Sequence, residues 1–516
     1  MRLLLVLLAL TLAIPASGQR ACRTRLRPFD GAGELRRRAD ELTTGVRAGF
    51  GIMRATVACL DDSTALHSKA AFGPVAPDIR AGYSGGLPDS RADGALWAGR
   101  GISVLVRAGF TLDWRAVHLA VIPEVWYTAN RPFDLLPGLD ATRSSLSSPF
   151  YAGRYSLDLP SRMGRQPIAE VSPGQSTLLI TTGPVDFGWS SSNLWWGAGV
   201  RDAIFIGPNA AGIPRAFVRT SSPVETILGR LSGEYFFGFL AESRYFDYDS
   251  RNDRRSLSAI AFTWSPSNTD AVVLGVARGV MKVSPDNSTI GRHLADAIIP
   301  LGISDGDQLT AFFARYALPK SGLRAYAELA RARTTSGLRD ILTVPNEGLA
   351  YQVGVETLVR RQRANWMFLA EALNLEQGVD VQQRPPRDFY TGDGTLQGWT
   401  QRGQLLGAGI GPGGQSQWLA VDRMAPHWSA GLFAERVRWN NDALFRQYLP
   451  YTNRHDVSLR MGARVGFRRL GYDVALDASW GKRLNYLFQN NEFIPSYRTV
   501  DVSVPQLHLT LSPVAR

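Results

Sequence analysis

Aromatic rings and arginines, gathered in two short blocks, are the side chains of this chain best suited to specific chemistry. The first block holds Trp195, Trp196 and Arg201, and the second holds Tyr390, Trp399 and Arg402. Sugar rings stack on aromatic faces, and arginine donates charge-assisted hydrogen bonds to carboxylates. The six residues are therefore a candidate binding site for a polysaccharide, and for an acidic one in particular. The competing interpretation is structural, because rings also fill interiors and line membrane interfaces.

The first block has an unusual local pattern. Successive strand residues point to opposite faces, so the two adjacent tryptophans each need cover on their own side. Small and amide residues surround the pair and are expected to be structural, with Asn193 holding a turn beside Gly197. These residues are Gly188, Asn193, Gly197, Gly199 and Asn209.

Enzyme chemistry finds little support in the sequence. The histidines are scattered and form neither a His-Glu-x-x-His run nor a clustered metal spacing. They are His67, His118, His293, His427, His455 and His508. We therefore expect no catalysis, no metal and no cofactor. A Ser-His-Asp hydrolase stays open as an alternative, because a triad is defined in space rather than by chain order.

The N-terminus predicts export. Arg2 precedes an apolar stretch over residues 3–14, which is too short to span a bilayer, and small residues follow at 16–18. Residues 1–18 are expected to be a cleaved signal peptide, with Gln19 beginning the mature chain. Export removes nucleic acid as a partner.

The chain is strongly basic, and nearly all of that charge is arginine. The formal net charge is +12 over 516 residues, and only four of the 57 basic residues are lysines, at positions 69, 282, 320 and 482. The forked donors of arginine suit carboxylates and phosphates. We therefore expect acidic polysaccharide, outer-membrane lipid and lipopolysaccharide as partners of a monomeric protein.

Alternating polarity predicts strands of a membrane barrel. Over residues 457–468 one parity is apolar, whereas the other carries three arginines, and residues 472–480 repeat the alternation. A tight turn at 470–471 would place Arg468 opposite Asp473 and Arg464 opposite Asp477, so that the charges pair across the strands. Apolar outside and polar inside is the pattern of a transmembrane barrel. A soluble sandwich is the alternative.

Connection lengths support the barrel. Residues 319–321 and 361–363 read as short turns, whereas 334–347 and 376–400 read as long loops, as in outer-membrane barrels. This order is expected to fail near residues 424–427, and a bulge is expected at Pro505. The fold predicted is all-β, a large antiparallel transmembrane β-barrel of about 16–20 strands, with 18 favoured, over residues 71–516.

Several sequence blocks resemble the Wzi-like capsule assembly proteins. The first block reads Ser-Asn-Leu-Trp-Trp-Gly-Ala-Gly over 192–199 and is followed by Asn-Ala-Ala-Gly-Ile-Pro over 209–214. Residues 162–164, 174–176 and 183–188 resemble the approach to this motif, and residues 390–393, 398–399 and 402–403 resemble the family's second block. A histidine near Asp393 and an aromatic near Thr395, frequent in the family, are both missing here. The resemblance spans most of residues 70–510.

The resemblance implies an outer-membrane β-barrel that holds capsular polysaccharide at the bacterial surface, with helices at its periplasmic end. Residues 30–44 carry Leu35, Ala39 and Leu42 at near-helical spacing, so 19–70 is expected to be a helical periplasmic segment. Cys22 and Cys59 flank this helix, and the oxidising periplasm favours a disulfide between them.

These features together predict a non-enzymatic outer-membrane barrel that binds exported polysaccharide and helps attach or assemble it at the cell surface. The main alternative is an outer-membrane porin or channel for sugars or anions, with an arginine-lined lumen that conducts. A barrel hydrolase is a third possibility.

Overall fold

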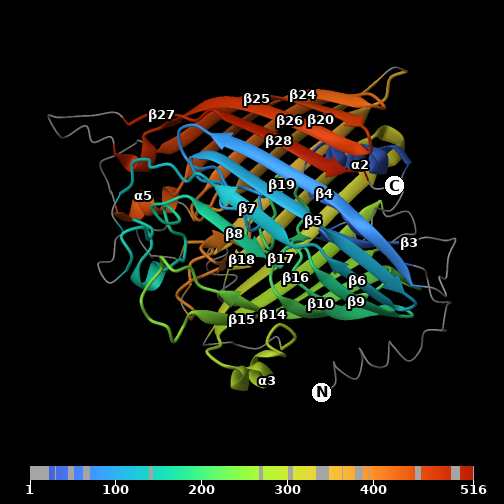
Figure 1. The fold of residues 1–516 in the computed structure, drawn as a ribbon, viewed down its shortest axis with the longest axis horizontal. Helices are drawn as coiled ribbons and strands as arrows, with labels where there is room; N and C mark the ends of the chain where they lie inside the picture. The colour runs from blue at the N-terminus through green and yellow to red at the C-terminus, as the bar shows by residue number, and fades with distance from the viewer. Residues whose placement is uncertain are drawn as a thin grey trace.

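Antiparallel strands close into one barrel (Figure 1). The structure is a computed structural model that describes residues 22–29, 31–44, 52–61, 70–136, 138, 143–266, 271–299, 306–332, 348–362, 364–377, 388–392, 394–447, 455–489 and 500–514. Eighteen strands form the barrel within these residues, as the alternating sequence predicts.

Four of the eighteen strands are interrupted and carry two labels each, because both pieces run along the same neighbours. In chain order the strands are β4 (Ala71–Ser84), β5 (Gly101–Trp114), β6 (Val117–Val121) with β7 (Glu124–Thr128), β8 (Ile168–Ser172) with β9 (Thr177–Thr182), β10 (Val185–Ser190), β12 (Arg215–Thr220) with β13 (Val224–Thr226), β14 (Gly229–Ala241), β15 (Arg254–Ser265), β16 (Val272–Val283), β17 (Asp307–Leu318), β18 (Leu323–Ala332), β19 (Leu349–Val359), β20 (Asn365–Asn374), β23 (Gln415–Met424), β24 (Trp428–Trp439), β25 (Asp456–Arg469), β26 (Tyr472–Leu484), and β27 (Val502–Ser503) with β28 (Gln506–Pro513). The barrel closes where β28 pairs with β4.

The two faces of the wall differ as the sequence predicts. On β25 the side chains of Leu459, Met461 and Phe467 are exposed on the outside, whereas Arg460 is buried inside. Exposed aromatic residues gather near both rims of the barrel, which is the arrangement of membrane-embedded barrels. Near one rim lie Trp114, Trp264, Trp366 and Trp428, and near the other lie Tyr83, Tyr127, Tyr351 and Trp480.

The predicted register of β25 and β26 is confirmed, but one of its two ion pairs is wrong. Arg468 lies opposite Asp473, and its Nε donates to Oδ1 of that carboxylate at 3.0 Å. Arg464 lies opposite Asp477 but instead bonds Asp422, with Nε to Oδ1 at 2.6 Å. Gly431 stands between Arg464 and Asp422 in the wall, and because it has no side chain the guanidinium reaches over it.

Short and long connections alternate around the whole barrel. The short ones are 115–116, 183–184, 227–228, 266–271, 319–322, 360–364, 425–427 and 470–471. The expected failure near 424–427 is wrong, because the 440–455 connection, which carries α5 (Asn441–Gln447), lies between β24 and β25 and restores the order. Of the predicted long loops, 334–347 lies outside the described residues, and 376–400 lies partly outside them.

The predicted bulge at Pro505 is also wrong. Lys482 pairs with Ser503 and Ser479 pairs with Gln506, so the register is the same on both sides of the interruption. Val502 and Val504 pack on the interior core, whereas Leu507 is exposed on the outside. The apolar side chains before Pro505 therefore face the interior and those after it face outward, with no extra residue inserted between them.

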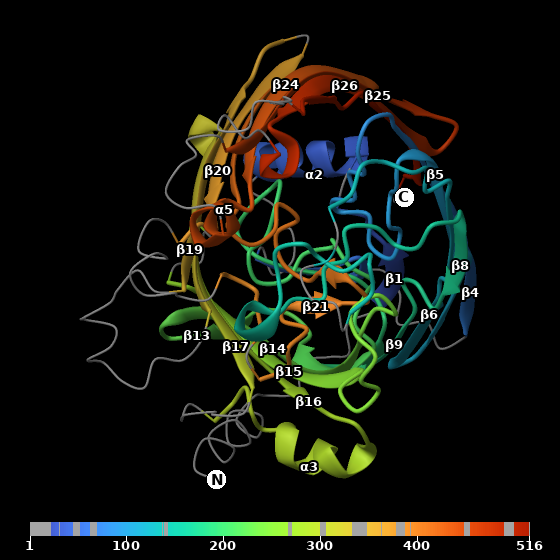
Figure 2. The same ribbon diagram turned by 90° about the vertical axis from the view of Figure 1, so that its left-hand side faces the viewer.

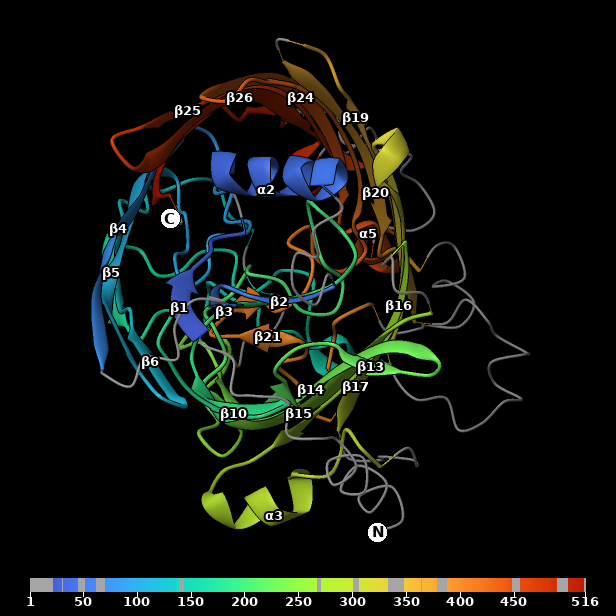
Figure 3. The same cartoon turned by 90° about the vertical axis from the view of Figure 1, so that its right-hand side faces the viewer.

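Short elements from both halves of the chain lie inside the ring of strands (Figures 2 and 3). β1 (Cys22–Leu26) pairs with β3 (Val57–Asp61), β2 (Met53–Ala55) pairs with β11 (Leu194–Trp196), and β21 (Thr400–Gln401) pairs with β22 (Gln404–Leu405). Short helical turns are η1 (Gly153–Tyr155), η2 (Asn287–Thr289), η3 (Pro319–Ser321) and η5 (Tyr486–Phe488), and α3 (Ile290–His293) lies outside the wall. No helix in the described part of the chain is long and apolar enough to span a membrane.

The expected N-terminal helix is α2 (Gly31–Thr44), and it lies at the rim with the short connections, opposite α5 (Figure 1). Leu35, Ala39 and Leu42 pack in one cluster with wall side chains, which are Leu358, Met367 and Met424. Arg36 donates to the backbone carbonyl of Pro426 at 2.9 Å, in one of the short connections. The signal peptide predicted over 1–18 lies outside the described residues.

A buried ion-pair network fastens α2 to the wall. Nε of Arg38 donates to Oε1 of Glu356 on β19 at 2.7 Å, and Nη1 of Arg324 on β18 donates to Oε2 at 2.8 Å. Glu356 is fully buried, so its charge is stabilised by these two guanidiniums alone among the described contacts.

Replacing this carboxylate should loosen the helix and the wall together. We expect Glu356→Gln to lower the free energy of unfolding by about 3 kcal/mol, because it leaves Arg38 and Arg324 buried without their counter-charge. Denaturant unfolding of the detergent-solubilised protein measures this. Glu225→Gln, an exposed position on β13, is the matched control. Equal stability of the two variants would show that the network contributes nothing.

The two cysteines lie on the paired strands β1 and β3. Cys22 is opposite Asp61 and Cys59 is opposite Thr24, while their side chains lie outside the described part. The disulfide stays a prediction. Mass spectrometry of protein isolated from cells should show a mass increase of about two protons on reduction, whereas two alkylatable thiols before reduction would contradict the bridge.

Candidate functional site

The barrel interior is filled by two connections, 191–214 and 388–414, which meet around Trp196. This ring is fully buried. It stacks on Phe205 with 6.0 Å between centroids and meets Phe236 of β14 edge-on at 5.2 Å. Trp196 therefore packs the first interior connection against the wall.

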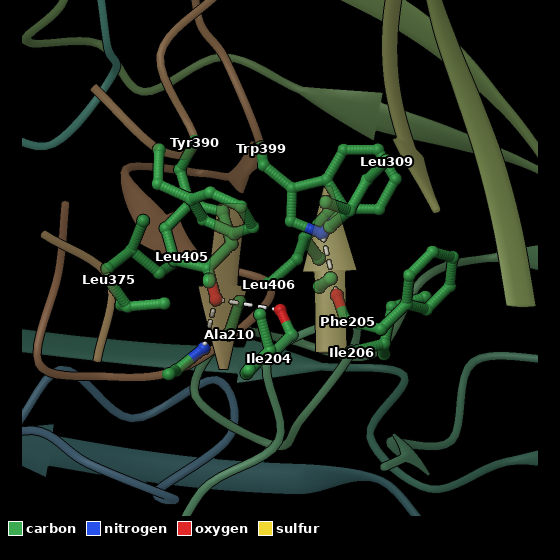
Figure 4. Packing of buried hydrophobic residues seen from close by; sticks show 14 of the residues in the cluster. Ile204, Phe205, Ile206, Ala210, Leu309, Leu375, Tyr390, Trp399, Leu405 and Leu406 are labelled. Atoms are coloured by element: carbon green, nitrogen blue, oxygen red, sulfur yellow. Dashed lines mark hydrogen bonds between the residues drawn. The ribbon is translucent and has the colours of Figure 1, made fainter. Parts of the chain in front are cut away.

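Tyr390 and Trp399 join the same cluster from the second connection (Figure 4). The Tyr390 hydroxyl donates to the carbonyl of Ile204 at 2.7 Å, and the Trp399 Nε1 donates to the carbonyl of Phe205 at 2.7 Å. Each of the two rings is 3% exposed. They therefore tie the two interior connections together through backbone carbonyls.

Trp195 has a separate role, which is to hold the N-terminal segment. Its backbone pairs with Arg54 of β2, and the Arg54 guanidinium lies 5.0 Å from the centroid of its ring. Phe29 packs on the same ring at 5.8 Å, and Nη1 of Arg54 donates to Oε1 of Glu34 on α2 at 2.8 Å. Neighbouring tryptophans thus bind different partners on opposite faces of β11.

The stacking role predicted for the four rings does not agree with this packing. Trp195, Trp196, Tyr390 and Trp399 are at most 3% exposed, which leaves no ring face for a sugar. The structure brings Trp196, Tyr390 and Trp399 together and separates the other three predicted residues from them. Arg201 lies 4.6 Å over the Trp418 ring, and Arg402 is exposed beside the end of β14, where its N–H donates to the carbonyl of Ala241.

Two carboxylates of the wall hold the connection that follows the tryptophans. Oε2 of Glu371 on β20 accepts the N–H of Val200 at 2.7 Å, and the N–H groups of Arg201 and Asp202 also donate to this carboxylate. Oε1 of Glu328 on β18 accepts two further N–H groups, from Ile204 at 3.0 Å and Phe205 at 3.1 Å. A buried carboxylate needs several donors of this kind, so these contacts fix where the connection lies.

The small and amide residues of the motif permit this close approach. A Cβ on Gly197 would lie 2.9 Å from Oε2 of Glu328, and one on Gly199 would collide with the carbonyl of Asp202 and the amide of Gln352. Asn193 donates from Nδ2 to the carbonyl of Ala210 at 2.8 Å, and the N–H of Ala92 donates to Oδ1 of Asn209 at 2.7 Å. Asn209 also donates to the carbonyl of Gly407.

Gly188 belongs to the barrel wall. It lies on β10 between Leu179 and Phe217, and a Cβ there would collide with the carbonyl of Leu178. The expected structural roles of the motif glycines and amides therefore have a geometric basis in backbone packing.

A side chain at position 199 should displace the interior connection. We expect Gly199→Val to lower the free energy of unfolding by about 1–3 kcal/mol, because neither the Asp202 carbonyl nor the wall can yield readily. Gly291→Val is the control, since nothing lies within 4 Å of a Cβ at that position. Thermal unfolding followed by circular dichroism compares them, and an unchanged midpoint for Gly199→Val would contradict the packing role.

A cavity of about 260 Å³ lies in the half of the barrel with the long connections. Its wall comes from strands β24, β25 and β26 and from the 85–100, 129–167 and 403–409 stretches. Polar and aromatic side chains line it together, as in small-molecule binding sites. The lining side chains include Asp89, Arg91, Trp97, Glu435, Trp439 and Arg460.

Two arginines and two carboxylates form a closed ring at this cavity. Nε of Arg91 donates to Oδ1 of Asp89 at 2.9 Å, and Nη2 of Arg91 donates to Oε2 of Glu435 at 2.7 Å. Arg460 completes the ring, with Nη1 to Oδ2 of Asp89 at 2.7 Å and Nη2 to Oε2 of Glu435 at 2.5 Å. Burial favours protonation of Asp89, but the two guanidiniums hold the pKa of its carboxyl well below the usual range.

Two tryptophans supply the apolar part of the lining. The indole Nε1 of Trp439 donates to the hydroxyl of Ser458 at 2.9 Å, which fixes the orientation of the ring. Arg483 covers one face of Trp439 at 4.6 Å and is itself paired with Asp456 at 2.7 Å. Trp97 contributes the second ring and is 8% exposed.

Comparison with known proteins identifies the type of barrel. Wzi from Escherichia coli, described as an outer membrane protein involved in group 1 capsule assembly and as a carbohydrate-binding β-barrel, superposes with a TM-score of 0.56 at 12% identity, covering 86% of this chain and 85% of that chain. The chain has the fold of an outer-membrane barrel. No protein-family model and no curated protein sequence matches it.

Porins of Pseudomonas aeruginosa align over a similar share of the chain but less well. OccK7 gives a TM-score of 0.40 at 10% identity, covering 86% of this chain and 98% of that chain. OccK2 in complex with glucuronate gives 0.39 at 10% identity, covering 86% and 97%.

The sequence missed most of the residues around the cavity. Arg460 lies on the polar parity of 457–468 and could be placed inside the barrel from that alternation. Asp89, Arg91 and Trp97 lie in an irregular connection without periodicity, so no pattern indicates which way their side chains face. Glu435 could have been noticed in the sequence, because acidic as well as basic residues occupy strand positions that face inward.

Asp202 makes stability depend on pH. Burial raises the pKa of its carboxyl to about 6, which Arg91 and Arg201 oppose and Glu371 reinforces. Because this pKa is higher in the folded chain than in the unfolded one, folding takes up a proton between about pH 4 and pH 6. The stability that Asp202 contributes is therefore complete at low pH and is lost as the pH rises through 6.

Removing this carboxyl should favour the folded state most at neutral pH. We expect the unfolding free energy of Asp202→Asn, relative to wild type, to grow by about 2 kcal/mol between pH 4.5 and pH 7.5. Denaturant unfolding at the two pH values measures the change. Asp249→Asn, at an exposed site whose pKa lies near 2, should show no such growth. A pH-independent difference for Asp202→Asn would contradict this prediction.

Proposed function

We propose that this protein is a Wzi-like outer-membrane barrel that binds exported polysaccharide at the cell surface and helps to attach or assemble it there. The observation that carries the proposal is the filled interior with a polar and aromatic cavity in the half with the long connections. Long connections of outer-membrane barrels face outward. A ligand in this cavity would therefore lie on the side where an exported polymer arrives.

The filled interior also bears on the channel alternative. A conducting lumen needs a continuous polar path, whereas here Trp196, Phe205 and Trp399 are packed in its middle at 0–3% exposure. Arginines expected to line a channel are paired instead, as Arg460 is with Asp89 and Glu435. These features support a binding protein over a porin, and the proposal includes no catalytic step.

The apolar outer face and the two aromatic rims support insertion in the outer membrane, with α2 at the periplasmic end. Export by the signal peptide and a monomeric state belong to the same proposal. Basic residues that face lipid headgroups would account for contacts with lipopolysaccharide, and the surface polysaccharide itself remains the main partner.

Deleting the gene in the native strain should release surface polysaccharide into the medium. We expect the cell-bound fraction to fall at least threefold and to be restored by the wild-type gene or by the Gly291→Val control, measured by uronic acid and hexose assays of washed cells and supernatant. Purified protein in planar bilayers should give no steady ion conductance. Retention of the polysaccharide by the deletion strain, or a stable open pore in bilayers, would overturn the proposal.

A further inference from the structure

The size of the cavity limits what it can hold. At about 260 Å³ it lies just below the range of roughly 300–1,000 Å³ that is usual for drug-sized ligands. One sugar unit with a few waters suits this space, whereas an oligosaccharide does not. A polysaccharide would therefore bind there through a single sugar residue or through a chain end.

The charges of the cavity are balanced. Arg91 and Arg460 each contact both Asp89 and Glu435, so the ring has two positive and two negative members. The remaining lining cation, Arg483, is paired with Asp456 behind it. An anionic ligand would have to approach two fixed carboxylates or displace one of them from two guanidiniums, and like charges in a buried site repel strongly.

Hydroxyl groups suit the same ring. A sugar hydroxyl both donates and accepts, and each carboxylate oxygen can accept more than one hydrogen bond. Adjacent hydroxyls of a sugar can thus donate to Asp89 or Glu435 without breaking the ion pairs. Gln506, whose Nε2 donates to Oδ2 of Asp89 at 2.7 Å, adds a neutral planar group at the edge of the ring.

The apolar lining fits the other side of a sugar. Trp97 and Trp439 form part of the cavity wall. The hydrogen bond from its indole to Ser458 fixes the orientation of the Trp439 ring, and Arg483 covers one face of that ring. Carbon-bound hydrogens of a pyranose ring pack on such aromatic surfaces.

We propose that this cavity binds one uncharged, hexose-sized residue of the exported polysaccharide, with its hydroxyls on the Asp89–Arg91–Glu435–Arg460 ring and its apolar face against the two tryptophans. The inference rests on the proposed function and deepens it. The proposed ligand is uncharged, unlike the acidic ligand that the arginine-rich sequence predicts, because the arginines at this site are already paired with carboxylates.

The test uses the full-length protein in detergent micelles and four probes. These are the methyl pyranosides of glucose, galactose and mannose, and the methyl glycoside of glucuronic acid. We expect at least one neutral glycoside to bind saturably in the millimolar range, by saturation-transfer NMR with titration, and the glucuronide to bind at least fivefold more weakly.

Ser161→Leu should fill the cavity and leave the charged ring intact, since Ser161 lines the cavity and its side chain makes no hydrogen bond to the ring in the described structure. We expect a tenfold or greater loss of binding. Ser145→Leu, an exposed position in the same 129–167 connection, is the matched control and should bind as the wild type does. Unfolding midpoints of both variants within a few degrees of wild type establish that each is folded.

The outcomes separate this inference from the proposed function. Binding of the glucuronide in preference to every neutral probe, abolished by Ser161→Leu, would overturn the uncharged ligand and leave the polysaccharide function standing. Failure of all four probes, or binding that Ser161→Leu leaves unchanged, would overturn the site itself. Polysaccharide retention by cells, measured with the deletion strain, reports on the proposed function independently of these binding data.

Discussion

Charge inside a closed barrel has to be neutralised by whatever fills the barrel, and the interior of this protein is organised by that constraint. Alternation along each strand turns one set of side chains inward, and here that set includes glutamates and arginines. Water is largely replaced by protein, so each buried charge needs counter-charges or several hydrogen-bond donors. Glu356 uses arginines of α2 and β18, whereas Glu371 uses backbone N–H groups. The wall and its filling therefore specify one another.

The adjacent tryptophans have packing roles in the interior. Trp196 packs on Phe205 and Phe236, while Trp195 holds Arg54 of the N-terminal segment. The glycines that follow let backbone amides approach the wall carboxylates. A motif that resembles a binding surface in the sequence instead joins three parts of the chain, and the cavity proposed above as the binding site is formed by residues from several separate stretches.

Local pattern was sufficient to predict the barrel. Parity along 457–480 correctly gave the outward and inward faces, the turn at 470–471 and the register of Arg468 with Asp473, because strand geometry repeats every two residues. The site was not predictable in this way, because Asp89 and Arg91 lie in an irregular connection and meet Glu435 and Arg460 only through the closure of the barrel. Arg464 illustrates the same limit, since its partner Asp422 lies two strands away and is reached only because Gly431 on the strand between them has no side chain.

Closure by the first and last barrel strands has a consequence for assembly. β4 follows the N-terminal segment and β28 ends the described chain, so the seam between them can form only after every other strand has been made. Once that seam has formed, a continuous hydrogen-bonded wall surrounds the interior connections and the N-terminal segment. Completion of the barrel therefore also encloses these interior segments, and a mutation that displaces one of them would act on closure of the wall as well as on the finished protein.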